Sequence, residues 1–178
     1  MESRSIPLDI AKPYCREIYY QLEDKQNFAV GFENRSGGYE LRNPYFKGST
    51  SPKDITHIEN GAKSICVVEG FIDFLSFLTL QKNVHPIRSD FLVLNSVGLA
   101  DRSLNILVRY RSIFLYLDHD NAGRKTQEKY KSAGLKTVDA SIIYKQYKDV
   151  NDYLISQKSS HKEVKKQQAI KKSGGLHL

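Results

Sequence analysis

The sequence predicts an α/β fold in which a parallel sheet is flanked by helices. From residue 64 onward, short apolar runs of the buried-strand kind alternate with stretches of helical spacing. Acidic residues directly follow several of these runs, and ligands of open parallel sheets bind where the strands end. Residues 1 to about 60 differ, being rich in Tyr, Asn, Gly and Ser. We therefore expect a small subdomain over residues 1–63, the sheet domain over 64–157, and a basic, flexible tail over 158–178.

The first part contains a predicted β-hairpin. Residues 27–33 and 39–43 have the composition of strands, and the turn between them contains Gly37 and Gly38. Glycine supplies the positive φ that a tight hairpin turn needs. Residues 43–53, with two prolines and a glycine, are expected to form a loop.

The second part has the periodicity of strands joined by right-handed helical crossovers. Gly134 is expected to close the third of its helices. The expected order is strand 64–68, helix 71–81, strand 91–94, helix 101–109, strand 113–117, helix 124–133, strand 137–144 and helix 151–157.

Bulk composition restricts the function classes without selecting one. The net charge of +7 favours polyanionic partners, but six lysines lie within residues 158–172, so charge alone does not establish nucleic-acid binding. The two cysteines, Cys15 and Cys66, cannot form a disulfide framework or a Cys-rich zinc site. We expect Cys66 to be a buried, inert thiol. No secretory signal or membrane span is expected, and we expect a cytoplasmic protein with reduced thiols.

The acidic residues are concentrated after the expected strands. They are Glu69, Asp73, Asp118, Asp120 and Asp149. Asp73 lies one helical turn after Glu69 and can share its face, and a spacing of two sends Asp118 and Asp120 to the same side of an extended chain. Such carboxylates repel one another unless a cation lies between them. Oxygen-only ligands suit Mg²⁺ or Mn²⁺ rather than zinc, and such an ion would polarise phosphate oxygens.

Each of these residues also has a structural interpretation. Asp118 and Asp120 could form a solvated turn, and Asp73 could simply favour a helix N-terminus. Asp149 is balanced between ligand and surface roles. His119 should point away from the two aspartates, and we do not expect it to bind a metal.

The helix after Asp120 is a candidate phosphate site. Asn121 is expected to be its N-cap. Arg124 and Lys125 would then occupy the first helical turn, where cations are electrostatically unfavourable. A phosphate bound at this helix end would explain them.

Four segments resemble motifs of a known family. Val-Val-Glu-Gly-Phe-Ile-Asp (67–73) resembles the glutamate motif of TOPRIM domains, and Leu-Asp-His-Asp-Asn-Ala-Gly-Arg (117–124) resembles their DxD motif. Asn-Ser-Val-Gly (95–98) is similar to a small-residue turn of bacterial DnaG-type primases. Lys-Asp-Val-Asn-Asp-Tyr-Leu (148–154) resembles the acidic motif that follows in primases.

The resemblance extends upstream. Residues 5–11 and the loop from Arg42 to Lys47 resemble the amino-terminal subdomain of a primase core. The resemblance implies a TOPRIM (Rossmann-like) parallel sheet with a small N-terminal α+β subdomain. It also implies a basic groove between the sheet and the subdomain that receives template and primer. By position, Arg42, Lys47 and Lys53 are candidates for that groove. Tyr39, Tyr45 and Phe46 could stack on bases or pack within the subdomain; both interpretations stay open.

The resemblance also implies roles for the acidic residues. Glu69 would act as general acid/base, and Asp118 and Asp120 would hold Mg²⁺ or Mn²⁺ with support from Asp73 and Asp149. Asn151 departs from the family, since replicative primases often have a second aspartate there, and weaker metal binding is expected.

The implied reaction is RNA primer synthesis on single-stranded DNA. A 3′-hydroxyl attacks the α-phosphate of a nucleoside triphosphate and pyrophosphate is released. The zinc-binding and helicase-binding domains of such primases are missing, so we expect a fragment or a pared-down relative, with a helicase or other replication protein as partner through the missing domains. The alternatives are a TOPRIM-type metal-dependent nuclease and a non-catalytic nucleotide- or nucleic-acid-binding module of a larger replication or mobilisation protein.

Overall fold

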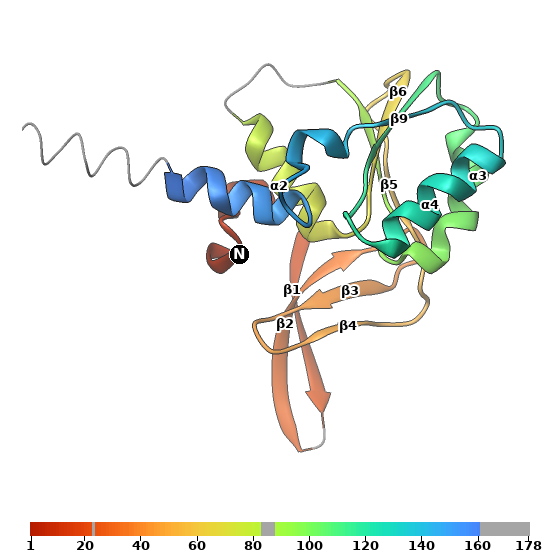
Figure 1. Ribbon diagram of the computed structural model, residues 1–178. Coiled ribbons are helices and arrows are strands. Elements are labelled where there is room, and N and C mark those ends of the chain that lie inside the picture. The colour runs from red at the N-terminus through yellow and green to blue at the C-terminus, as the bar shows by residue number, and fades with distance from the viewer. Residues whose placement is uncertain (23, 83–87, 161–178) are drawn as a thin grey trace, which may run out of the picture.

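The computed structural model describes residues 1–22, 24–82 and 88–160, which form two sheets (Figure 1). The first sheet is antiparallel, and its strands pair in chain order. They are β1 (Cys15–Leu22), β2 (Lys25–Glu33), β3 (Tyr39–Arg42) and β4 (Lys47–Ser49). The expected hairpin is confirmed, with Gly37 at a φ of 82°. The expected loop 43–53 is wrong in its middle, because β4 pairs there with β3.

The second sheet has the strand order β5-β7-β6-β8-β9. Its members are β5 (Thr56–Ile58), β6 (Ser64–Val68), β7 (Asp90–Val93), β8 (Ser112–Tyr116) and β9 (Thr137–Asp139). All neighbours pair in parallel except β5, which runs antiparallel to β7. The expected parallel sheet is confirmed. Its edge strand β5 comes from residues that the sequence analysis placed in the first part, and the division at residue 63 stays a prediction.

The helices cover both faces of the second sheet (Figure 1). They are α2 (Phe71–Gln81), α3 (Ala100–Leu107), α4 (Asn121–Ser132) and a helix over residues 150–160. The core side chains of α2 and of the 150–160 helix form one apolar cluster, and those of α3 and α4 belong to a second cluster on the other face. Short elements complete the described chain: α1 (Leu8–Ala11) and the 3-10 helices η1 (Glu2–Arg4), η2 (Val97–Leu99) and η3 (Ser141–Tyr144). No helix in these ranges is long and apolar enough to cross a bilayer.

The strand expected over residues 137–144 is wrong beyond Asp139. The Asp139 carboxylate accepts hydrogen bonds from the backbone N–H and the hydroxyl of Ser141, at 3.0 and 2.6 Å. This local turn ends β9 and starts η3. Gly134 closes α4 as expected, with a φ of 77°. Most of the basic tail lies outside the described residues.

The two sheets are joined by aromatic packing and by a buried carboxylate. Phe32 of the first sheet stacks on Phe71 of α2, with ring centroids 5.3 Å apart. Asp54, which is 2 % exposed, lies in the connection between the sheets. It accepts hydrogen bonds from Arg35, Ser36 and Arg102, at 3.3, 2.7 and 3.3 Å. The face of the first sheet that turns toward α2 is therefore fixed relative to the strand ends of the second sheet.

Replacing Asp54 with asparagine is expected to lower the free energy of unfolding by about 2–3 kcal/mol at pH 7, because charge-assisted hydrogen bonds are lost. Burial raises the pKa of Asp54, but the hydrogen bonds from Ser36, the Ile55 N–H and Arg102 outweigh it, so the pKa lies below its ordinary value of 3.8. A carboxylate with a depressed pKa stabilises the fold at pH values above its unfolded-state pKa. This stabilisation is lost as the pH falls through the folded-state pKa. Urea unfolding at pH 7 and near pH 3 should therefore show a difference between wild type and variant that shrinks in acid. An equal difference at both pH values would contradict this role.

Candidate metal centre and its cavity

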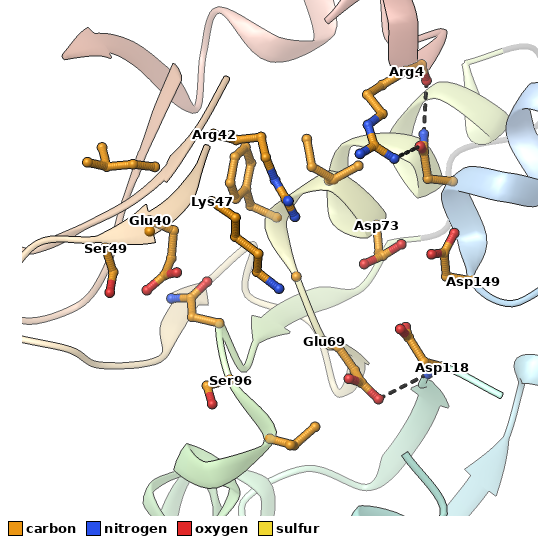
Figure 2. A pocket seen from close by; sticks show the side chains of 18 of the residues that line it. Arg4, Glu40, Arg42, Lys47, Ser49, Glu69, Asp73, Ser96, Asp118 and Asp149 are labelled. Atoms are coloured by element: carbon orange, nitrogen blue, oxygen red, sulfur yellow. Dashed lines mark hydrogen bonds between the residues drawn. The ribbon is translucent and has the colours of Figure 1, made fainter. Parts of the chain in front are cut away.

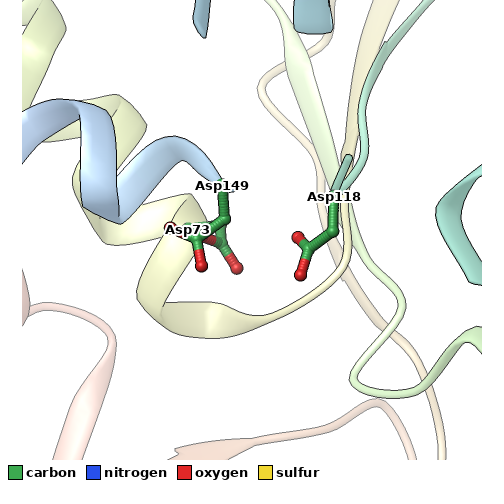
Figure 3. Close-up of side chains that lie close together, drawn as sticks. All are labelled: Asp73, Asp118 and Asp149. Carbon is green, nitrogen blue, oxygen red and sulfur yellow. The ribbon is translucent and has the colours of Figure 1, made fainter. Parts of the chain in front are cut away.

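Three aspartates from separate elements converge at the carboxyl end of the second sheet (Figure 3). Asp118 follows β8, Asp73 lies in the first turn of α2, and Asp149 immediately precedes the 150–160 helix. One carboxylate oxygen from each lies within 4.8 Å of the others. Parallel strands that end at one edge, followed by helices that start there, produce this convergence.

Glu69 lies beside this group, directly after β6. Its Oε1 accepts a hydrogen bond from the Asp118 N–H at 3.1 Å, which ties the ends of β6 and β8 together. Burial, and then the charge of Asp118, raise the pKa of Glu69 to about 7. A carboxylate with such a pKa can exchange a proton near neutral pH.

The aspartates disfavour one another's charged forms. Burial and the charge of Asp149 raise the pKa of Asp118 to about 6, although Lys148 Nζ, 3.9 Å from Asp118 Oδ2, opposes the shift. Burial, then Asp149 and Asp118, raise the pKa of Asp73 well above its ordinary value. A divalent cation would relieve this repulsion. The donor set is made of oxygens alone, so it fits Mg²⁺ or Mn²⁺.

Asp120 has a different position from the one its spacing suggests. It is the N-cap of α4, and its Oδ1 accepts hydrogen bonds from the N–H groups of Ala122 and Gly123, at 2.9 and 3.0 Å. The N-cap expected at Asn121 is therefore wrong by one residue. Asp120 is not part of the group of three aspartates. Metal binding by Asp120 stays a prediction.

The start of α4, where the sequence predicts a phosphate site, lies outside the cavity that contains the aspartates. Arg124 and Lys125 are exposed on the helix and do not line the cavity described below. Arg124 donates a hydrogen bond to the Asn121 side chain. Phosphate binding by these two cations stays a prediction.

Gly123 allows α4 to approach the site closely. A Cβ atom at this position would overlap the Asp118 carbonyl oxygen and would lie 3.0 Å from Glu69 Oε1. We expect Gly123→Ala to cost about 1–3 kcal/mol of stability by overpacking. It should also weaken Mn²⁺ binding, because Asp118 must shift. Urea unfolding and calorimetry measure both effects.

Gly98→Ala is the matched control, since a Cβ atom there would meet only Ser96 Oγ at an ordinary 3.6 Å. A Gly123→Ala variant that behaves like Gly98→Ala in both measurements would show that the close approach is unimportant.

A cavity of about 460 Å³ extends from the aspartates to the first sheet (Figure 2). Its acidic wall contains Glu69 and the three aspartates, and its opposite wall comes from β3, β4 and the following loop. The three cations predicted from the sequence, Arg42, Lys47 and Lys53, all line it. The structure thus brings the predicted basic residues to the predicted acidic ones.

Two buried polar atoms in this cavity lack partners. Among the described residues, Arg42 Nε and Asn95 Oδ1 are the buried side-chain atoms without a hydrogen bond, and both residues line the cavity. Unpartnered buried polar groups are rare in folded proteins. Both residues therefore have hydrogen-bonding capacity that the described residues leave unused.

Sequence analysis missed two cations of the cavity, Arg4 and Lys148. Arg4 is far away in sequence, and its Nη1 donates to Asn151 Oδ1 at 3.2 Å. Asn151, which is 1 % exposed, also donates to the Arg4 carbonyl and to Ser76 Oγ, each at 2.9 Å. An aspartate could not donate these bonds. Asn151 therefore holds the N-terminal segment against α2, a role that its deviation from the family pattern could have indicated.

His119 and Cys66, for which the sequence predicted no role in metal binding or catalysis, both lie in structural surroundings. The His119 ring forms hydrogen bonds with Tyr147 and Ser141, outside the aspartate group. Cys66 is buried, and burial raises the pKa of its thiol.

The three aromatic residues of the first part differ from one another. Phe46 packs against Tyr20, with ring centroids 5.6 Å apart, and Tyr39 donates a hydrogen bond to Glu33. Tyr45 is 98 % exposed, so packing does not explain it.

Two of the solved structures that share this fold come from bacteriophage T7. The primase fragment of the bacteriophage T7 primase-helicase superposes with a TM-score of 0.62 at 19 % identity, over 94 % of this chain and 72 % of that one. A bacteriophage T7 assembly of lagging-strand DNA polymerase with primase domains, an RNA/DNA hybrid and dTTP contains a chain that matches with a TM-score of 0.60 at 19 % identity, over 94 % of this chain and 88 % of that one. These likenesses show the fold. No curated protein sequence matches the chain.

Family matches divide the sequence in two. A domain family of unknown function, DUF8464, matches residues 1–51. The Toprim-like family matches residues 66–154, which contain Glu69 and the three converging aspartates. This match confirms the TOPRIM domain that the motifs suggested, and the two T7 structures share its fold. Because the match covers half of the 178 residues, the chain belongs to the Toprim-like family.

Proposed function

We propose that this chain catalyses primase-like, Mg²⁺-dependent nucleotidyl transfer on single-stranded DNA. The observation that carries the proposal is one cavity in which Glu69 and the three aspartates face the cations of the first sheet, with Glu40 beside those cations and Lys148 beside Asp118. Phosphoryl transfer needs charge neutralisation, positioning of phosphates and removal of a proton. The two walls offer residues for each of these tasks.

The acidic wall supplies the metal ligands and the base. Asp73, Asp118 and Asp149 would hold Mg²⁺ or Mn²⁺, which when bound neutralises charge on the phosphates. Glu69 accepts the proton of the primer 3′-hydroxyl while the hydroxyl oxygen forms a bond to the α-phosphorus of the nucleotide. The bond from that phosphorus to the bridging oxygen breaks, and pyrophosphate leaves.

The basic wall binds the phosphates of template and nucleotide. The side chains of Arg42 and Lys47 extend from β3 and β4 into the cavity that the aspartates line (Figure 2), and Lys53 lines the same cavity. The Arg42 side chain, which lines the cavity, would donate to such an anion. In a replication setting, a helicase or another replication protein would be the partner that presents single-stranded DNA, in the cytoplasm.

The proposal is tested by incubating the chain with single-stranded DNA templates, labelled nucleoside triphosphates and Mg²⁺ or Mn²⁺. Template-dependent oligonucleotides are the expected product. Shortening of labelled DNA would instead indicate the nuclease. Nucleotide binding with neither product would indicate a non-catalytic module.

Replacing Arg42 and Lys47 together with glutamine is expected to weaken single-stranded DNA binding about 10- to 100-fold at low salt. Each lost phosphate contact should reduce the slope of log K against log[salt] by about 0.7, or about 1.4 for the pair. Fluorescence anisotropy of labelled oligo-dT across a salt series measures both quantities.

Lys63→Gln with Arg111→Gln is the matched control, since both residues are exposed and precede β6 and β8 at the opposite edge of the sheet. The control removes the same charge and should leave the slope nearly unchanged. Equal effects from the two double variants would mean that net charge, rather than the cavity, drives binding.

A further inference from the structure

The segment that carries Lys148 and Asp149 needs an external support. Residues 145–149 form turns and bends between η3 and the 150–160 helix, without a ladder of their own. Asp149 nevertheless lies in the group with Asp118, which belongs to the end of a sheet strand. Some contact must set the separation of these two carboxylates.

Lys148 and Asn151 on either side of Asp149 are held by Asp118, Arg4 and Ser76, and the backbone directly before Asp149 is held by His119, the residue that follows Asp118. Its backbone N–H donates to the Lys148 carbonyl at 2.9 Å. Its ring Nδ1 lies 2.8 Å from the Tyr147 carbonyl oxygen. Because a carbonyl oxygen only accepts, Nδ1 donates this bond. One residue thus binds two consecutive carbonyls directly before Asp149.

The His119 ring is itself held in one orientation. Its Nε2 lies 3.0 Å from Ser141 Oγ, and the Ser141 hydroxyl donates its one proton to Asp139 at 2.6 Å. The ring packs against Tyr144, with centroids 5.1 Å apart. The Tyr144 hydroxyl donates to the Leu117 carbonyl at 3.0 Å, so the packing partner is fixed to the same strand end.

The network therefore connects three places: the end of β9, the end of β8 and the segment before Asp149. We propose that His119 is a positioning residue that holds the segment 147–149 at the separation from Asp118 at which the aspartates can share one cation. The sharing of one cation rests on the proposed function, whereas the hydrogen bonds of His119 can be tested without metal. Groups that orient metal ligands typically affect metal affinity about 10- to 100-fold.

The variants are His119→Ala and His119→Asn. Alanine keeps the backbone bond to Lys148 but removes the ring. Asparagine restores an N–H donor on a short side chain that can reach the Tyr147 carbonyl, without the bond to Ser141. A positioning role predicts that asparagine recovers much of what alanine loses.

The first readout is amide hydrogen exchange in metal-free protein. Peptides that cover residues 117–120 and 144–150 should exchange faster in His119→Ala than in wild type, with His119→Asn between them. The second readout is calorimetric Mn²⁺ affinity, which should fall about 10-fold or more in His119→Ala and recover largely in His119→Asn.

Ser103→Ala controls for a general loss of stability. Ser103 is buried between α3 and α4, away from the aspartates, and its hydroxyl lies 2.8 Å from the Tyr130 hydroxyl. This variant should lose stability while keeping wild-type exchange at 144–150 and wild-type Mn²⁺ affinity.

Wild-type exchange in His119→Ala, or a loss of Mn²⁺ affinity no greater than in Ser103→Ala, would overturn the positioning role and leave the proposed function standing. Absence of Mn²⁺ binding by the wild type would overturn the proposed function instead. Hydrogen exchange would then still decide whether His119 holds the segment.

Discussion

Asp118→Asn is expected to reduce metal-dependent nucleotidyl transfer by about 10³-fold or more. Metal-ion stabilisation of transition-state charge is worth several kcal/mol, and each 1.36 kcal/mol is about tenfold in rate. Asparagine preserves the size of the side chain and the backbone N–H bond to Glu69, so the loss should come from the missing charge. Initial rates of labelled product formation at saturating Mg²⁺ measure the effect.

The metal-free Asp118→Asn variant should be at least as stable as wild type, because burial and Asp149 disfavour the Asp118 charge. Asp101→Asn removes an exposed carboxylate that pairs with Lys129 on the far side of the sheet and should keep full activity. An inactive Asp118→Asn protein that is also unfolded, or an equal loss of activity in Asp101→Asn, would contradict the assignment.

Glu69→Gln is expected to slow the chemical step by about 10²- to 10⁴-fold, the usual contribution of a general base. Glutamine can still accept the Asp118 N–H bond, and Glu69 is not one of the three converging aspartates. Mn²⁺ affinity should therefore change little, and the KM for nucleotide should stay close to that of wild type. Single-turnover kinetics and calorimetry separate the two effects.

A fall in Mn²⁺ affinity as large as that of Asp118→Asn would contradict the role of Glu69 as a base and identify it as a ligand. Unchanged turnover in Glu69→Gln would remove it from the chemistry.

The sequence predicted the arrangement of the site correctly where an acidic residue directly follows an apolar strand. The apolar run 64–68 predicted β6, Glu69 after it predicted a side chain at the sheet edge, and the helical spacing predicted α2 with its observed bounds. The same reasoning predicted that Asp118 follows a strand, as it follows β8, because an interior strand of a parallel sheet has a clear apolar pattern.

Features that depend on partners distant in sequence were missed. The short edge strand β5 has no apolar pattern of its own and forms because β7 offers an open edge. Spacing could not show that Asp120 caps α4 while Asp118 joins the group of three aspartates, since both follow the same strand. The role of Asn151 depends on Arg4, which lies 147 residues away.

Calorimetric titration of Mn²⁺ into wild type and Asp118→Asn tests the central claim most directly. Saturable binding at one site in wild type, lost in the variant while the fold stays intact, is the predicted result. No binding by wild type, even with nucleoside triphosphate and single-stranded DNA present, would contradict the metal centre and leave a TOPRIM-shaped scaffold without this chemistry. Equal binding by both proteins would place the ion elsewhere.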